Sequence, residues 1–174
     1  VLMRQVSQAS AQEVARAVAA EAWRIERAFS RYRDDNIIAA INRAEGAWVS
    51  IDAETDRLLD YADICWQLSA GMFDITSGIL RRVCRFDGSD NFPEPEAVTR
   101  CLGLIGWPLV GRRPGEVRCK PGMELDFGGI GKEYAVDRAL HAARALMDSP
   151  VLVNFGGDIA AWCGTEEPWQ VGLE

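Results

Sequence analysis

The clearest hydrophobic pattern in the chain lies near its N-terminus, where one apolar residue recurs at every third or fourth position. Such spacing places the residues on one face of an α-helix. They are Val14, Val18, Ala22, Ile25 and Phe29. Ser10 and Glu13, just before the stripe, have the spacing of a capping box. We therefore predict a long amphipathic helix that begins at Ser10.

Helical spacing also predicts three further helices, over residues 52–69, 96–102 and from about 132 to 147. The first of these ends before Gly71, a residue typical of helix C-termini. The positions expected to face inward are Leu58, Ala62, Cys65 and Leu68 in the first helix, and Val136, Leu140, Ala143 and Met147 in the last.

Short apolar stretches bounded by turn residues predict strands. They are residues 116–119, 123–127, 151–155 and 169–174. Residues 72–78 are too short and too alternating for a helix. Residues 85–95 are rich in Asp, Gly, Asn and Pro, which predicts a surface loop.

Composition excludes several classes of protein. The 174 residues contain 19 Lys and Arg against 26 Asp and Glu, a formal charge of −7. An acidic chain is a poor partner for nucleic acid or anionic membranes, so we expect no nucleic-acid binding. The five cysteines are widely spaced without a Cys-x-x-Cys pair. They indicate neither a zinc site nor a disulfide framework, and we expect buried or half-buried thiols.

The chemistry-bearing segment is residues 123–132, an apolar strand that runs into Gly128-Gly129-Ile130-Gly131-Lys132 and then a helix. A glycine turn at a helix N-terminus brings backbone N–H groups onto an anion, usually a phosphate. The alternative is that the glycines merely permit a tight turn, and the pattern does not decide between the two. A P-loop is excluded because Glu133 stands where that motif has Ser or Thr.

Two acidic residues lie beside glycine pairs, Asp126 before Gly128 and Asp158 after Gly157. Either carboxylate could bind a ribose, a base edge or a hard cation, or could cap the N–H groups of its own turn. Tyr32 and Phe73 lie in polar or glycine-containing loops, where a planar ring could stack on a flat ligand.

Residues 125–137, Leu-Asp-Phe-Gly-Gly-Ile-Gly-Lys-Glu-Tyr-Ala-Val-Asp, closely resemble the signature of the ApbE family, the FAD:protein FMN transferases. Residues 29–42, 73–78 and 153–158 agree with the family in the same order. The resemblance implies an α+β fold, with a mixed or antiparallel sheet and packed helices, that binds FAD with Mg²⁺. It implies a reaction that splits FAD, attaches FMN through its phosphate to a Thr or Ser of a target flavoprotein, and releases AMP.

The resemblance also implies site residues. It places Tyr32 against the flavin, and the loop Phe73, Asp74 and Ile75 along the cofactor, largely through backbone groups. It places the backbone carbonyl of Gly129 on the metal. The remaining positions expected to contact FAD are Asp126, Lys132, Asn154, Gly156, Gly157 and Asp158. No catalytic residue is implied.

The chain departs from the family pattern, and these departures leave alternative functions open. We expect one domain over residues 1–174 that is incomplete at both ends, because the family's C-terminal metal-binding segment is absent. A non-catalytic FAD-binding or interaction module is therefore an alternative, as is a pyrophosphatase giving FMN and AMP. Unpaired sheet edges predict self-association or pairing with a C-terminal fragment. Many relatives are exported lipoproteins of the bacterial periplasm or inner membrane; without an upstream export signal we expect the cytoplasm.

Overall fold

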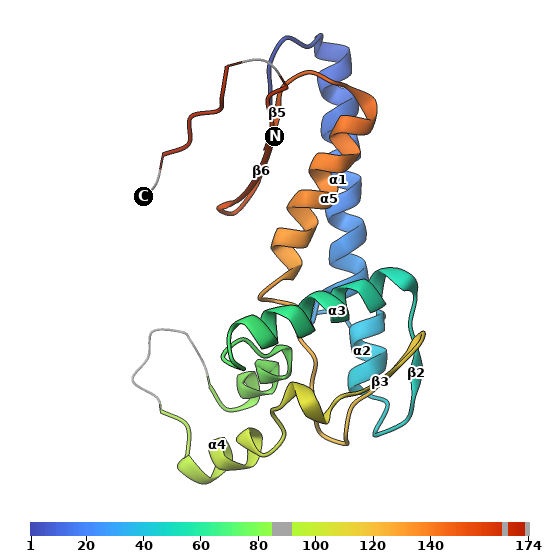
Figure 1. Ribbon diagram of the computed structural model, residues 1–174, viewed down its shortest axis with the longest axis vertical. Coiled ribbons are helices and arrows are strands. Elements are labelled where there is room, and N and C mark those ends of the chain that lie inside the picture. Colours follow the sequence, from blue (N-terminus) through green and yellow to red (C-terminus); the bar gives the residue numbers. More distant parts are fainter. Residues whose placement is uncertain (85–91, 165–166, 173–174) are drawn as a thin grey trace. The chain divides into compact units, whose positions relative to one another are not determined.

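The computed structural model describes residues 1–84, 92–164 and 167–172 (Figure 1). The chain divides into two compact units, one of Val1–Ala28 with Ile130–Glu174 and the other of Phe29–Gly129. Each contains a three-stranded sheet, and every strand pair of the described residues is antiparallel. The fold is α+β, as the resemblance implies.

The first unit contains the two long helices. α1 (Gln8–Phe29) and α5 (Gly131–Leu146) run alongside each other in Figure 1. The sheet has the order β1-β5-β6, formed by β1 (Leu2–Met3), β5 (Val151–Phe155) and β6 (Asp158–Trp162). Small side chains pack the helices and sheet into one core; its buried members are Val14, Val18, Val136, Ala139, Ala143, Val151, Val153 and Ala160. Small and β-branched residues permit this close approach of helix to sheet.

The second unit is built from shorter elements. These are α2 (Ile37–Asn42), β2 (Val49–Ser50), α3 (Ala53–Leu68), the 3₁₀ helix η1 (Ile75–Arg82), α4 (Pro95–Leu102), the 3₁₀ turn η2 (Trp107–Leu109), β3 (Gly111–Arg113) and β4 (Glu116–Arg118). The sheet order is β2-β4-β3. The apolar side chains with at most 1% exposure in this unit include Ile38, Ile41, Leu59, Ile79, Val117, Met123, Leu125 and Phe127.

The predicted helices are confirmed, and local chemistry explains their ends. Asp52 accepts a hydrogen bond from the Thr55 N–H (2.7 Å) and begins α3. At its other end the chain turns through a positive φ at Ala70 and Gly71, where the Gly71 N–H donates to the Trp66 carbonyl. All five cysteines are free and buried or half-buried, as expected. Burial raises the pKa of the Cys119 thiol to about 12, so this group stays protonated and unreactive.

Two details of the helices differ from the prediction. α1 begins at Gln8 rather than Ser10, because Ser7 accepts the Ser10 N–H on its hydroxyl and the Ala11 N–H on its carbonyl. The residue that caps the helix is therefore Ser7, three residues before the expected Ser10. Leu68, expected to face inward, is 84% exposed, since the inward face of α3 ends at Ala62 and Cys65.

The predictions outside the helices need several corrections. Residues 123–127 form no sheet ladder, and residues 169–172 form no strand; positions 173–174 lie outside the described residues. The segment after Asp74, expected not to be helical, becomes η1, because the Asp74 side chain caps it. The strands β2, β3 and β6 were not predicted. Most of the expected loop at 85–95 lies outside the described residues.

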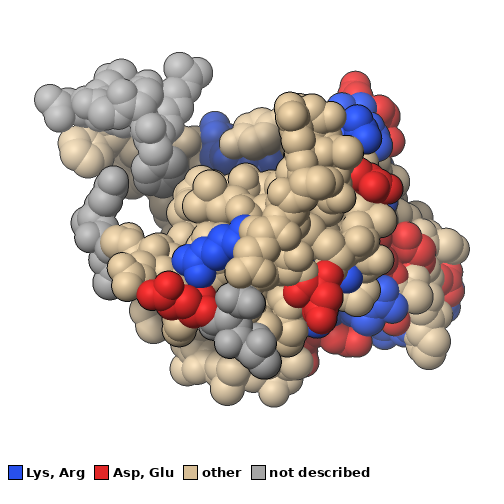
Figure 2. Space-filling model, turned by 90° about the horizontal axis from the view of Figure 1, so that it is seen from above, with Lys and Arg blue, Asp and Glu red and all other residues tan. Residues whose placement is uncertain are grey.

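Acidic and basic side chains of the described residues lie interspersed among uncharged ones on the face drawn in Figure 2. Within the described ranges, none of the helices combines the length and apolar character needed to cross a bilayer.

Candidate functional site

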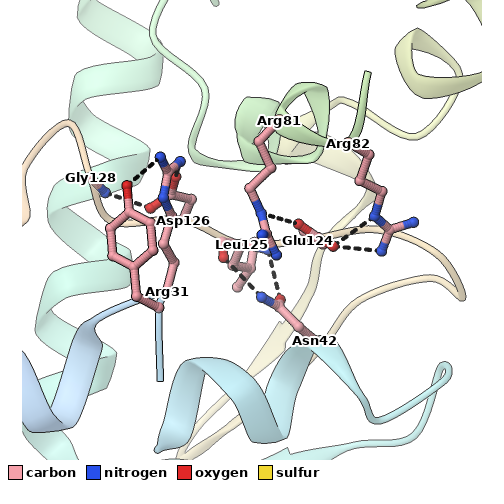
Figure 3. Close-up of polar contacts among 9 residues, drawn as sticks. Arg31, Asn42, Arg81, Arg82, Glu124, Leu125, Asp126 and Gly128 are labelled. Atoms are coloured by element: carbon pink, nitrogen blue, oxygen red, sulfur yellow. Dashed lines mark hydrogen bonds and ion pairs between the residues drawn. The ribbon is translucent and has the colours of Figure 1, made fainter. Parts of the chain in front are cut away.

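The segment that carries Asp126 is held in place by a side chain instead of a neighbouring strand. Asn42, the last residue of α2, accepts the Leu125 N–H (2.7 Å) and donates to the Leu125 carbonyl (3.0 Å) (Figure 3). The Asp126 N–H donates to the Ile75 carbonyl (2.8 Å). These bonds satisfy buried backbone groups that a sheet would otherwise pair. They fix the position from which the Asp126 carboxylate projects.

The Asp126 carboxylate is mostly buried, with 13% of its side chain exposed, and both oxygens have partners. One oxygen accepts the Gly128 N–H (2.8 Å), so Asp126 does cap its own turn. The other pairs with the Arg31 guanidinium at 2.5 Å. The space around it is tight, because a Cβ on Gly78 would lie 2.5 Å from the Asp126 Cβ. The carboxylate is therefore fixed by η1 on one side and by Arg31 on the other.

Tyr32 is the exposed aromatic residue of this cluster, with 82% of its surface accessible. Arg31 donates to the Tyr32 hydroxyl (2.9 Å), and its guanidinium carbon lies 4.9 Å from the centre of the Tyr32 ring. The hydrogen bond to Tyr32 and the charge of Asp126 raise the pKa of Arg31. A ring that is both exposed and held by a charged neighbour can stack on a planar ligand.

Phe73 accounts for the absence of a side chain at Gly129. A Cβ built on Gly129 would lie 2.7 Å from the Cε2 atom of Phe73, closer than real Cβ atoms come to carbon. Gly128 and Gly129 are exposed. Glycine is required here by the aromatic ring, whatever the role of the Gly129 carbonyl.

The side chains of Asp74 and Ile75 contact other parts of the protein: one is hydrogen-bonded and the other is buried. Asp74 accepts from the N–H and hydroxyl of Thr76 (2.8 and 2.6 Å) and from the Trp107 N–H (2.8 Å). The fully buried Thr76 hydroxyl also accepts the Gly106 N–H (2.8 Å). Ile75 is 4% exposed. Only backbone groups and the Phe73 ring of this loop remain to face a ligand.

A second charged cluster lies next to Asp126 in the sequence. Glu124 is buried, and its two oxygens accept from Arg81 Nε (3.0 Å) and Arg82 Nε (2.7 Å) of η1. A buried carboxylate is tolerated when it is paired in this way. The ion pairs of Glu124 with Arg81 and Arg82 join η1 to the segment that carries Asp126 (Figure 3).

In the first unit, the N-terminus of α5 has no side-chain cap. Ile130 occupies the cap position without a capping hydrogen bond. Lys132 lies in the first turn, with 63% of its side chain exposed, and forms an ion pair with Asp158 (3.0 Å). The hydrogen bond and charge of Asp158 raise the pKa of Lys132. Uncapped N–H groups and a neighbouring ammonium suit an anionic ligand.

The second glycine pair belongs to a hairpin. Gly156 (φ +65) and Gly157 (φ +104) join β5 to β6, and the Asn154 side chain accepts the Gly157 N–H (2.9 Å). Two consecutive residues with positive φ are typical of a type I′ turn. Asn154 and the glycines therefore close a hairpin, and the Asp158 carboxylate pairs with Lys132 instead of capping the turn.

The predicted site residues fall into two groups, one in each unit. The second unit brings Asp126 to Gly128 and Phe73 to Gly129; the first brings Lys132 to Asp158 and Asn154 to Gly157. Sequence reasoning missed Arg31, Asn42 and the Arg81–Arg82 pair. Arg31 and Asp126 are 95 residues apart, and no spacing rule joins them. The hairpin had a signal, since Gly-Gly between apolar stretches is typical of a two-residue turn.

Comparison with solved structures identifies the class of fold. The fold is that of ApbE flavin transferases: the Pseudomonas stutzeri flavinyl transferase ApbE in its apo form superimposes with a TM-score of 0.83 at 21% identity, over 93% of this chain and 53% of that one. The ApbE protein of Thermotoga maritima superimposes with a TM-score of 0.77 at 26% identity, over 92% of this chain and 51% of that one.

Sequence comparison identifies the family. The family described as ApbE matches residues 2–174, and the chain belongs to the ApbE family. The FAD:protein FMN transferase of Treponema pallidum is 31% identical over 147 residues, 78% of this chain and 40% of that protein. The enzyme of the same name from Klebsiella pneumoniae is 28% identical over 88% of this chain and 51% of that protein. The chain thus spans about half the length of the curated relatives it matches, or less.

Proposed function

We propose that this chain forms the FAD-binding part of an FAD:protein FMN transferase. The observation that carries the proposal is the turn that leads from Asp126 into α5. Its two glycines are exposed, the helix N-terminus has no side-chain cap, and Lys132 lies in the first helical turn. The names of the Treponema and Klebsiella relatives support FAD as the substrate.

The diphosphate of FAD fits this turn for a physical reason. Phosphoryl transfer depends mainly on positioning and on neutralising charge, more than on covalent help from the protein. The N–H groups of the first turn of α5 and the Lys132 ammonium both favour an anion. Tyr32 and Phe73 supply aromatic surface for the isoalloxazine ring. For Asn154, Gly156 and Gly157 the proposal keeps the role that the family resemblance implies, contact with FAD.

The reaction we propose transfers the FMN phosphoryl group. The oxygen of an acceptor Thr or Ser bonds to the FMN phosphorus, the phosphorus–oxygen bond to AMP breaks, and the acceptor hydroxyl loses its proton. The chemical roles that this chain's residues can fill are binding the diphosphate and orienting the flavin. No residue of the described ranges is assigned as the base.

Magnesium does not fit the described residues as a complete site. No group of three or more His, Cys, Asp or Glu side chains is gathered among them. The Gly129 carbonyl could give one oxygen ligand of the kind Mg²⁺ prefers, but one ligand does not make a site. We therefore derive no step through the metal.

Binding of FAD tests the proposal. Equilibrium dialysis of the full chain should show FAD binding that K132Q weakens about tenfold, because a charge-assisted contact to phosphate is lost. The matched control is K120Q, which removes the only other lysine, an exposed one that lies outside the turn and the first turn of α5. A chain that binds no FAD, or equal losses in the two variants, would contradict the proposal.

A second experiment separates transfer from binding alone. The chain is mixed with the C-terminal half of the Klebsiella relative, FAD, Mg²⁺ and an acceptor flavoprotein, and AMP is measured by chromatography. The proposal expects Mg²⁺-dependent AMP release together with a flavinylated acceptor. Because the described residues lack a metal cluster, a non-catalytic FAD-binding module is the second candidate. FAD binding indifferent to Mg²⁺, with no AMP under any of these conditions, would favour it.

A further inference from the structure

The exposed Tyr32 ring is fixed by its neighbour in the sequence. Most of an exposed tyrosine ring has no packing to restrict it, and Tyr32 is 82% exposed. Its backbone N–H donates to the Ser30 hydroxyl (3.3 Å), which orients the main chain only. The ring itself is held by Arg31, through the hydroxyl at 2.9 Å and through the ring face at 4.9 Å.

Arg31 can hold the ring because its own far end is anchored. Its second terminal nitrogen pairs with Asp126, whose carboxylate also accepts the Gly128 N–H. The Asp126 backbone is in turn bonded to Ile75, and Gly78 packs against its Cβ. The contacts therefore form a continuous series from η1 through Asp126 and Arg31 to the Tyr32 hydroxyl. Figure 3 shows the middle of this series, where Arg31, Asp126 and Gly128 meet.

We propose that Arg31 is a positioning residue that holds the Tyr32 ring in the orientation that stacks on the planar ring of the substrate. This inference rests on the proposed function, in which that planar ring is the isoalloxazine of FAD. Arg31 acts through Tyr32 and not through the diphosphate. Its charge is already matched by Asp126 at 2.5 Å, and a planar guanidinium held at both ends has a fixed geometry that an ammonium would not reproduce.

This role predicts an effect that does not depend on phosphate. The variant R31M keeps a long apolar side chain and removes both bonds. It should raise the Kd for FAD and for riboflavin, which has no phosphate, by about the same factor, on the order of tenfold. It should also reduce the quenching of bound riboflavin fluorescence, which requires an aromatic ring stacked on the flavin. R33M is the matched control, because Arg33 lies on the same loop and pairs with Asp35.

A double-mutant cycle shows whether Arg31 acts through Tyr32. Y32F keeps the ring and removes the hydroxyl that Arg31 holds, so it should weaken riboflavin binding about threefold. In the R31M background the same change should have no further effect. Thermal melts of all variants confirm that each is folded before binding is measured.

The ligand-free chain gives a readout that does not require flavin binding. With ¹³C-labelled tyrosine, assigned by comparison with Y32F, the Tyr32 ring resonances should move toward free-tyrosine positions and sharpen in R31M but not in R33M. Unchanged Tyr32 resonances would overturn the inference, as would additive effects in the cycle. Loss of FAD binding with riboflavin binding intact would overturn it too, since Arg31 would then serve the diphosphate. Wild-type chain that binds neither ligand would instead remove the proposed function, and with it the flavin-stacking role.

Discussion

Two glycine pairs look alike in the sequence and differ in the structure. Gly128-Gly129 and Gly156-Gly157 each follow an apolar stretch that ends in Phe. At the second pair both φ angles are positive, and an added Cβ would meet nothing within 4 Å. At the first pair an added Cβ on Gly129 would lie 2.7 Å from the Phe73 ring. Gly156 and Gly157 are needed because their backbone has positive φ angles. Gly129 is needed because the Phe73 ring leaves no space for a side chain.

The difference shows how to separate a structural turn from a candidate binding turn. The Gly156-Gly157 hairpin is closed by its own strand, since the Asn154 side chain accepts the Gly157 N–H. The Gly128-Gly129 turn brings an aromatic ring against the backbone and leads into a helix end without a side-chain cap. The Gly128-Gly129 turn therefore leads to helix N–H groups that no side chain caps, and such groups favour an anion.

The largest expected effect is at Gly129. G129A should lower the free energy of unfolding by about 2 kcal/mol, because overpacking forces the Phe73 ring to move. Urea denaturation measures the loss. G129N should be no better than G129A, since the left-handed preference of Asn does not help where space is lacking. Recovery of stability in G129A/F73L identifies the ring as the cause, whereas a neutral G129A would contradict the account.

The two acidic residues beside the glycine pairs should differ next. D126N removes the charge that pairs with Arg31 in a mostly buried site, and should cost about 1.5 kcal/mol. D158N removes the partner of the exposed Lys132 and should cost clearly less than D126N, because an exposed ion pair contributes little to stability. Urea denaturation of both variants at pH 7 compares them. Equal losses would show that the two carboxylates are equivalent and that the distinction drawn between the turns is wrong.

A smaller effect is expected at the hairpin. G156A should cost about 1 kcal/mol, because a Cβ disfavours the left-handed conformation. G156N should be close to wild type, since Asn-Gly is a preferred type I′ pair. This rescue by Asn is the reverse of the expectation at Gly129. Thermal unfolding of the two variants is sufficient, and a G156N variant as unstable as G156A would argue against a strained turn.

The smallest effect concerns pH. Asp158 raises the pKa of Lys132, so the ion pair stabilises the fold below the ordinary lysine pKa. Its contribution is lost as the pH rises through the folded-state value. NMR titration of the Lys132 side chain should show the raised pKa in the wild type and its return toward the ordinary value in D158N. An identical titration in D158N would show that Asp158 is not the cause.

The sequence predicted the parts of this fold that depend on local patterns. Val14 and Val18 marked the buried face of α1, and Asp52 marked the start of α3. What failed depended on partners distant in the chain. Residues 123–127 have the composition of a strand, yet Asn42, 83 residues away, replaces the neighbouring strand. The composition of residues 123–127 gives no information about a partner so distant in the sequence.

The candidate site was predictable to a similar degree. The resemblance placed Asp126 and Phe73, and the structure gives each a neighbour that no motif indicated, Arg31 and the bare face of Gly129. Asp74 illustrates the remaining difficulty. Its position in a motif implies a cofactor contact, largely through backbone groups, and its carboxylate is bonded to Thr76 and Trp107. A carboxylate near a site does not reveal from sequence whether it faces the ligand or the fold.

The most direct measurement is an amide NMR titration of the ¹⁵N-labelled chain with FAD. The account predicts that the N–H signals of Gly128, Gly129, Gly131 and Lys132 shift most, and more than those of Gly156 and Gly157. ADP, which carries the diphosphate without the flavin, should shift the same turn. Saturable FAD binding that leaves residues 128–132 unmoved, or moves the hairpin glycines instead, would contradict the claim that this turn holds the diphosphate.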